Sequence, residues 1–120
     1  MPLVRKGNTL PKTKVKVKIP SQIKLASITY KVYLDKNLEK DGDWGHHRGR
    51  KQEILVNPIM TGEQQVVTVF HELLHASKMI WGTRLSEGDI DRVANCLATF
   101  LDNLGVEFDW SEIPVRELEL

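Results

Sequence analysis

The sequence lacks several features that would assign it to a particular class of protein. It contains a single cysteine, Cys96, so a disulfide framework is excluded and a reducing compartment is favoured. No apolar run approaches the roughly 18 residues of a membrane-spanning helix. Residues 1–6 lack the hydrophobic segment of a secretory signal. The net charge of +1 gives the 120-residue chain no strong attraction to nucleic acid or membranes. We therefore expect a single cytoplasmic domain with no membrane contact.

The segment around Phe70 contains the pattern HExxH, formed by His71, Glu72 and His75. On an α-helix, residues four apart lie on one face, so both imidazoles can point at one metal ion. Glu72 lies about 100° around the helix and can reach a water held by that metal. Two histidine ligands and a glutamate base are the arrangement of zinc hydrolases. The pattern predicts Zn²⁺ as cofactor, His71 and His75 as ligands, and Glu72 as the catalytic base.

The residues around this motif favour a helix over about residues 62–81. Thr61 and Gln64 fit a capping box at its start, and Gly82 fits its end. An apolar stripe at helical spacing runs through Val67, Phe70, Leu74 and Trp81. The two histidines flank that stripe. Two buried histidines without a metal are the alternative interpretation of the same spacing.

A second helix is predicted over about residues 87–104. Ser86 fits its N-cap, with Asp89 three residues later, and Gly105 fits the position after its end. Apolar residues recur at helical spacing from Ile90 through Leu104.

This second helix offers the third protein ligand that a zinc site needs. Glu87 and Asp91 match the pattern of zincins in which the glutamate binds zinc and the acid four residues later supports a ligand histidine. A shifted assignment makes Asp91 the ligand, with Asn95 behind it. We favour Glu87 because its side chain reaches further from the helix. A first-turn carboxylate that only stabilises the helix dipole is the structural alternative for Glu87.

Three stretches outside these helices predict β-strands. They are 23–25 with 28–34, joined by a tight bend, and 51–57 just before the first helix. We expect the 51–57 strand to form the sheet edge beside a cleft, where an extended peptide could add as a further strand. Residues 35–50 predict a loop, or a short strand followed by a turn. In it, His46, His47 or Arg48 is a candidate for stabilising an oxyanion, and Trp44 is interpreted as a packing residue.

The two ends of the chain differ in charge. Residues 1–20 carry Arg5, Lys6 and several further lysines, and alternate apolar with basic residues over 13–19. This predicts a basic arm or a lysine-protected edge strand. Nucleic acid binding is not favoured, because no aromatic residues stand between the lysines. Residues 106–120 form an acidic tail that either packs across the domain, binds a partner or contacts the basic arm.

Residues 21–105 resemble the small zincin-like HExxH proteins of bacteriophages and bacteria that are distantly related to the ImmA/IrrE-type metallopeptidases. The matching pieces are Ile54-Leu55-Val56, His71-Glu72-Leu73-Leu74-His75-Ala76, Leu85-Ser86-Glu87 with Ile90-Asp91-Arg92-Val93-Ala94-Asn95, and Leu101-Asp102-Asn103. The resemblance implies an α+β fold: a small antiparallel sheet packed on the HExxH helix, plus a second long helix. It also implies zinc, a protein or peptide substrate, and the host cytoplasm if the protein is phage-encoded.

One departure from the family pattern concerns the third ligand. Where the wider group often has Glu in Glu-x-x-Ala-Asn, this chain has Asp91, which leaves Glu87 and Asp91 both open as ligands. The leading hypothesis is a zinc-dependent metallopeptidase. The alternative is a catalytically silent zincin-like module that binds a host or phage protein.

Overall fold

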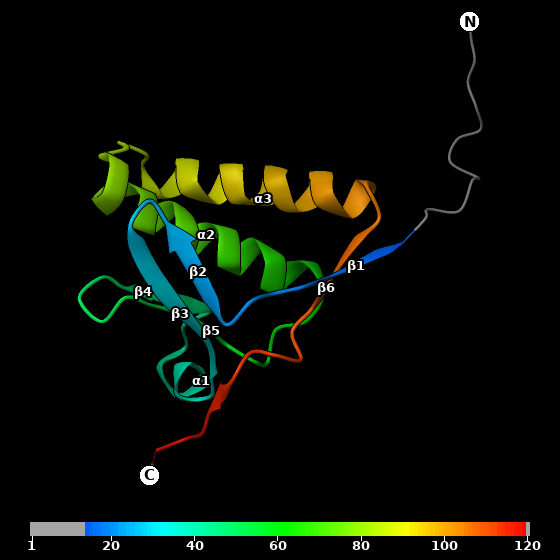
Figure 1. Cartoon of the computed structure of the whole chain (residues 1–120), viewed down its shortest axis with the longest axis horizontal. Coiled ribbons are helices and arrows are strands. Elements are labelled where there is room, and N and C mark those ends of the chain that lie inside the picture. Colours follow the sequence, from blue (N-terminus) through cyan, green and yellow to red (C-terminus); the bar gives the residue numbers. More distant parts are fainter. Residues whose placement is uncertain (1–13, 120) are drawn as a thin grey trace, which may run out of the picture.

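The computed structural model describes residues 14–119. Residues 1–13 of the predicted basic arm, with Arg5, Lys6 and Lys12, lie outside the described residues. The predicted α+β class is confirmed: two long helices, α2 and α3, pack on one side of a β-sheet (Figure 1). In chain order the elements are β1 (Val15–Lys18), β2 (Gln22–Leu25), β3 (Ile28–Asp35), α1 (Asn37–Asp41), β4 (Gly45–Arg48), β5 (Glu53–Val56), α2 (Glu63–Trp81), α3 (Glu87–Asn103), β6 (Val106–Asp109) and β7 (Val115–Arg116).

The main sheet has the strand order β2-β3-β5-β4, with β7 paired to the end of β3. The predicted bend between β2 and β3 is confirmed, and Ala26 within it has a φ of 55°. The sheet is mixed, which corrects the expectation of an antiparallel sheet. Strand β3 runs parallel to both β5 and β7, whereas β2–β3 and β4–β5 are antiparallel.

Strand β5 lies inside the sheet, which corrects the expectation that it forms the edge. Ile54, Leu55 and Val56 are each 0% exposed, as expected for a strand that is covered on both faces. The edge beside the helices is β4, from the segment that was expected to be a loop or short strand. Helix α1 was not predicted at all.

The core lies between the sheet and α2. Tyr30 and Val32 of β3, Ile54 of β5, Ala76 of α2 and Ile113 form one buried cluster. The central strands and α2 are therefore firmly packed together, and the HExxH segment is part of α2.

The helix ends follow the sequence signals with one exception. Ser86 caps α3 by accepting a hydrogen bond from the Asp89 amide at 3.1 Å, and Gly82 ends α2 with a φ of 68°. The predicted capping box at Thr61 is wrong, because the N-cap of α2 is Gly62 with no side-chain cap. Gly62 has φ 56° and ψ −131°, a conformation open to glycine because it has no Cβ.

The basic and acidic ends of the chain meet. Strand β1 runs parallel to β6, from the pair Val15 and Val106 onward. Lys14 contacts Glu107 at 3.1 Å, and Lys18 contacts Glu112 at 3.2 Å. These ion pairs offset part of the positive charge that a nucleic acid partner would need.

The C-terminal strand β7 is held by a more buried ion pair. The Arg116 guanidinium donates to both carboxylate oxygens of Glu53, at 3.3 and 3.1 Å, and lies 4.1 Å from the centre of the Tyr33 ring. It also lies 3.9 Å from the buried carboxylate of Asp35. Arg116 thereby ties the end of the chain to the middle of the sheet.

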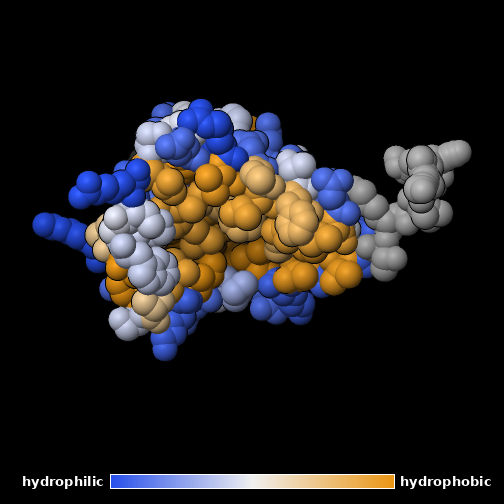
Figure 2. All heavy atoms as spheres, turned by 90° about the horizontal axis from the view of Figure 1, so that it is seen from above, coloured by the Kyte–Doolittle hydropathy of each residue, from blue (hydrophilic) through white to orange (hydrophobic). Residues whose placement is uncertain are grey.

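Helix α3 turns an apolar stripe toward solvent. Ile90, Ala94 and Ala98 are buried, whereas Leu97, Phe100 and Leu104 are 38%, 58% and 54% exposed. Figure 2 shows hydrophobic side chains gathered on the face seen from above, which is the side of α3 in Figure 1. Within residues 14–119, no helix combines the length and hydrophobicity needed to cross a membrane.

Candidate metal centre

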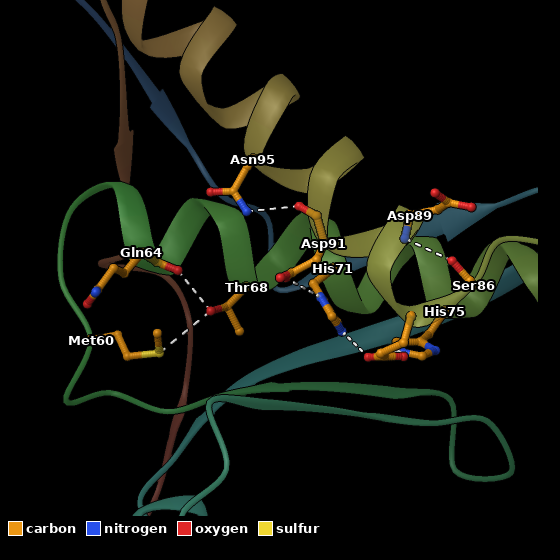
Figure 3. Close-up of polar contacts among 10 residues, drawn as sticks. Met60, Gln64, Thr68, His71, His75, Ser86, Asp89, Asp91 and Asn95 are labelled. Atoms are coloured by element: carbon orange, nitrogen blue, oxygen red, sulfur yellow. Dashed lines mark hydrogen bonds and ion pairs between the residues drawn. The ribbon is translucent and has the colours of Figure 1, made fainter.

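The side chains of His71, His75 and Glu87 converge between α2 and α3. His71 Nε2 lies 2.9 Å from Glu87 Oε1, and His75 Nε2 lies 3.3 and 3.2 Å from the two carboxylate oxygens. The two imidazole rings are 5.0 Å apart between centroids. Figure 3 shows both histidines on α2 and the first turns of α3 beside them. The HExxH spacing thus places the two rings as the sequence predicts.

The connection between the helices brings Glu87 to this position. Gly82 ends α2 in the left-handed conformation, and Ser86 starts α3 after a short link. The chain therefore reverses within a few residues, and the first turn of α3 lies against the middle of α2. Glu87 is the first residue of α3, so its side chain reaches back over both histidines.

The donor set fits a zinc ion. Two imidazole nitrogens and one carboxylate oxygen lie within 4.8 Å of one another. Ligands about 2.1 Å from a tetrahedral zinc are about 3.4 Å apart. The distances of 2.9–3.3 Å between the histidine nitrogens and Glu87 are close to that separation. In the structure, hydrogen bonds join Glu87 to both histidines, and coordination of a metal would replace them. For Glu87, desolvation acts to raise the pKa, but the hydrogen bonds and charges of the two histidines lower it overall.

Asp91 lies on the other side of His71. Its Oδ1 is 3.4 Å from His71 Nδ1, whereas Glu87 contacts Nε2 of the same ring. Asn95 donates to the backbone carbonyl of Asp91 at 2.8 Å. The geometry matches the assignment of Glu87 as ligand and Asp91 as the group that orients His71. It does not match the shifted assignment, with Asp91 as ligand and Asn95 behind it, because the Asn95 side chain donates to a backbone carbonyl.

Glu72 is buried between α2 and β4, and it borders a cleft. Glu72 is only 7% exposed. Burial raises the pKa of Glu72 to about 7; the charge of His71 opposes this, and Glu87 and Asp43 add to it. A carboxyl group with a pKa near neutrality is suited to accept and return a proton.

The cleft has a volume of about 630 Å³ and starts beside His71. Its walls come from α2, α3 and the start of β4. The lining residues are Trp44, Gly45, Glu63, Gln64, Val67, Thr68, His71, Glu72, Asp91 and Asn95. The candidate metal centre therefore opens onto a space large enough for a peptide segment.

Trp44 and Gly45 are among the cleft residues that were not anticipated from the sequence. Trp44 is 58% exposed and lines the cleft, so its interpretation as a packing residue is wrong. Gly45 lets β4 approach α2 closely, because a Cβ there would lie 2.5 Å from Thr68 Cγ2. A glycine inside a short strand was the available signal for this close approach.

The proposed oxyanion donors lie elsewhere on β4. His46 is exposed, and the His47 Nε2 lies 3.1 Å from the hydroxyl of buried Tyr30. Burial, followed by the charges of His75 and His46, lowers the pKa of His47. The Arg48 guanidinium is 3.9 Å from Glu53. None of these three side chains is among the residues that line the cleft.

Comparisons of the chain with protein-family models, with curated proteins and with solved structures found no match in any of the three.

Proposed function

We propose that this protein is a zinc-dependent metallopeptidase that hydrolyses a peptide bond in a protein substrate. The observation that carries the proposal is the convergence of His71 and His75 on Glu87 beside a cleft. His71, His75 and Glu87 would hold the metal, and Asp91 would orient the His71 ring. Three protein ligands leave one tetrahedral position for water, as in catalytic rather than structural zinc sites.

The chemistry of the proposal divides between the metal and Glu72. When bound, zinc supplies a Lewis acid that polarises a carbonyl and lowers the pKa of water toward about 7. Glu72 borders the cleft next to His71 and would take the proton from the attacking water. It would then return that proton to the leaving amine. The pKa of about 7 in the metal-free chain arises mainly from burial, and a bound cation would lower it.

Strand β4 supports the placement of a peptide. It is the terminal strand of the sheet beside α2, so one side of its backbone has no neighbouring strand among the described residues. An extended peptide could pair with that side through main-chain hydrogen bonds. Such pairing would hold a peptide beside the cleft without requiring a particular sequence.

The metal is tested first, by elemental analysis of purified protein. We expect near one zinc per chain in the wild type and loss of zinc in both His75→Ala and Glu87→Ala. His46→Ala is the matched control, because it removes an exposed histidine outside the cluster. Retention of zinc in Glu87→Ala would refute the assigned third ligand. Absence of zinc in every form, even after reconstitution, would refute the metal centre.

Catalysis is tested with Glu72→Gln, which keeps the size of the side chain and removes its basicity. We expect this variant to bind zinc as the wild type does and to lose cleavage of a protein substrate found by proteomic comparison. A Glu72→Gln protein that still cleaves that substrate would contradict the mechanism.

A second candidate function is a binding module that grips a protein without cutting it. The observation that favours it is the exposed stripe of Leu97, Phe100 and Leu104 on α3, because contiguous apolar surface often marks a protein interface. Under this function, Phe100→Ser would abolish the effect of the protein on its binding partner, and Glu72→Gln would leave that effect intact. The peptidase predicts the reverse for Glu72→Gln.

A further inference from the structure

The cleft extends beyond the candidate metal centre toward the first turn of α2. Glu63, Val67 and His71 are spaced four residues apart, so they lie on one stripe of the helix, and all three line the cleft. Glu63 is therefore about 12 Å from His71 along the helix axis. About three or four residues of an extended peptide cover that length. A peptide with its scissile bond beside His71 would reach Glu63.

The cleft is lined by carboxylates. Glu63, Glu72 and Asp91 contribute them, and the described lining includes no lysine or arginine. Asp91 is engaged with His71. Glu72 is 7% exposed, so little of its side chain is accessible to a bound molecule.

Glu63 is the carboxylate left for a bound molecule. It is exposed, and within residues 14–119 it makes no hydrogen bond or ion pair through its side chain. Glu63 lies in the first turn of α2, so one role of its negative charge is to stabilise the helix through the helix dipole. That role leaves both carboxylate oxygens available to a cation.

Trp44 adds a second element that binds cations. Its side chain is 58% exposed, and the residue lines the same cleft as Glu63. An indole face attracts lysine and arginine side chains that lie within about 6 Å of the ring centre. An exposed tryptophan and an unpaired carboxylate in one cleft therefore share a preference for the same class of side chain.

We propose that Glu63 and Trp44 form a subsite for a lysine or arginine side chain of the peptide bound in the cleft. This inference rests on the proposed function in one respect, since it takes the cleft as a peptide-binding site. It adds that the substrate is basic within a few residues of the bond that is cut.

The test measures peptide binding by fluorescence anisotropy on the zinc-treated Glu72→Gln protein, which prevents cleavage. The probes are labelled alanine–serine peptides of about eight residues, long enough to span the cleft. One set carries a lysine at each position in turn, and the matched set carries norleucine, which has the same straight carbon chain without the charge. At the best position we expect lysine to bind about tenfold tighter than norleucine.

Variants assign that preference to the subsite. Adding Glu63→Gln should reduce the lysine preference to about threefold or less, and adding Glu63→Lys should favour a glutamate peptide instead. Trp44→Leu should also weaken the preference, because it removes the aromatic face. Glu39→Gln is the matched control: it removes one exposed carboxylate on α1, outside the cleft, and should leave the preference unchanged.

The outcomes separate this inference from the proposed function. Absence of a lysine preference at every position, or equal losses in Glu63→Gln and Glu39→Gln, would overturn the subsite. A preference that depends on Glu63 in a protein that holds no zinc and cleaves nothing would uphold the subsite and refute the peptidase. A zinc-loaded, active peptidase without the preference would do the opposite.

Discussion

Replacing Gly45 by alanine is the sharpest test of how β4 is seated on α2. A Cβ at this position would lie 2.5 Å from Thr68 Cγ2, 3.0 Å from Glu72 Oε2 and 3.1 Å from the Leu55 carbonyl oxygen. Carbon atoms prefer separations of about 3.5–4.0 Å, so the contact with Thr68 is short by about 1 Å. Overpacking of this kind costs about 1–3 kcal/mol. We expect the free energy of unfolding to fall by that amount.

The same substitution should disturb the site. One of the crowded atoms is the Glu72 carboxylate oxygen, which borders the cleft. To relieve the contact, either β4 moves away from α2 or the Glu72 side chain turns. Either change displaces the proposed base relative to a bound peptide, so peptide cleavage should fall more than zinc binding. Zinc binding would depend on His71, His75 and Glu87, and none of them supplies one of the three heavy atoms nearest to the new methyl group.

Two further variants isolate the cause. Gly88→Ala makes the same chemical change in the first turn of α3, where the nearest atom is 3.4 Å away on the flexible Arg92 side chain. It should stabilise the protein by up to about 1 kcal/mol, because alanine favours a helix more than glycine does. Thr68→Ser keeps the hydroxyl that donates to the Gln64 carbonyl at 2.8 Å and removes Cγ2. Combined with Gly45→Ala, it should restore part of the lost stability.

Urea unfolding followed by circular dichroism measures all four proteins. A Gly45→Ala protein as stable as the wild type would show that β4 does not approach α2 as closely as described. Equal destabilisation of the single and double variants would show that Thr68 is not the group that the new methyl meets. Destabilisation by Gly88→Ala as well would point to a general loss from adding a methyl group and would refute the local explanation.

Three other changes test the remaining contacts. Arg116→Met should lower the free energy of unfolding by about 2 kcal/mol at pH 7, because it breaks a partly buried, two-pronged ion pair with Glu53. Hydrogen bonding from Arg116 lowers the pKa of Glu53 in the folded chain, so the stabilisation from this ion pair is present above pH 4.5 and shrinks as the pH falls further. Urea titrations of the wild type and Arg116→Met at pH 7 and pH 3 measure the loss of stability at each pH. An equal loss at both pH values would refute the role of Glu53 ionisation. Asp91→Ala should keep the zinc site but weaken metal affinity about 10- to 100-fold in a chelator competition, whereas unchanged affinity would show that Asp91 does not support His71. A double-mutant cycle on Lys18 and Glu112 should give a coupling of less than about 1 kcal/mol, because both side chains are more than half exposed. A larger coupling would mean that this ion pair, in addition to the backbone ladder with β6, holds β1 to the C-terminal part of the chain.

The elements that carry the candidate site were predictable because their signals are local. The HExxH spacing puts His71 and His75 one turn apart on any helix, and the Ser86 cap fixes where α3 begins. The bend between β2 and β3 is equally local. In each case the residues that determine the structure lie within a few positions of one another, so their periodicity and chemistry are visible in the sequence.

The contacts that were not predicted join distant parts of the chain. A contact between the basic arm and the acidic tail was only one of three alternatives, because alternating lysines indicate a strand without indicating that β6 is its neighbour. The interior position of β5 depends on β4 covering one side of it, and β4 is a glycine- and histidine-containing segment with weak strand propensity. Gly45 is readable as a strand glycine, but its contact with Thr68 exists only after α2 has packed on the sheet.

The choice between Glu87 and Asp91 also depends on this packing. The two residues are one turn apart on α3, so the sequence allows either carboxylate to face the histidines. A neutral imidazole offers one nitrogen to a metal and a hydrogen from the other, so the nitrogen that each carboxylate meets distinguishes their roles. Glu87 meets Nε2 of both His71 and His75, whereas Asp91 meets only Nδ1 of His71. A metal shared by both histidines through Nε2 would therefore have Glu87 as its neighbour, and Asp91 would be left to accept the Nδ1 hydrogen and hold the ring in place.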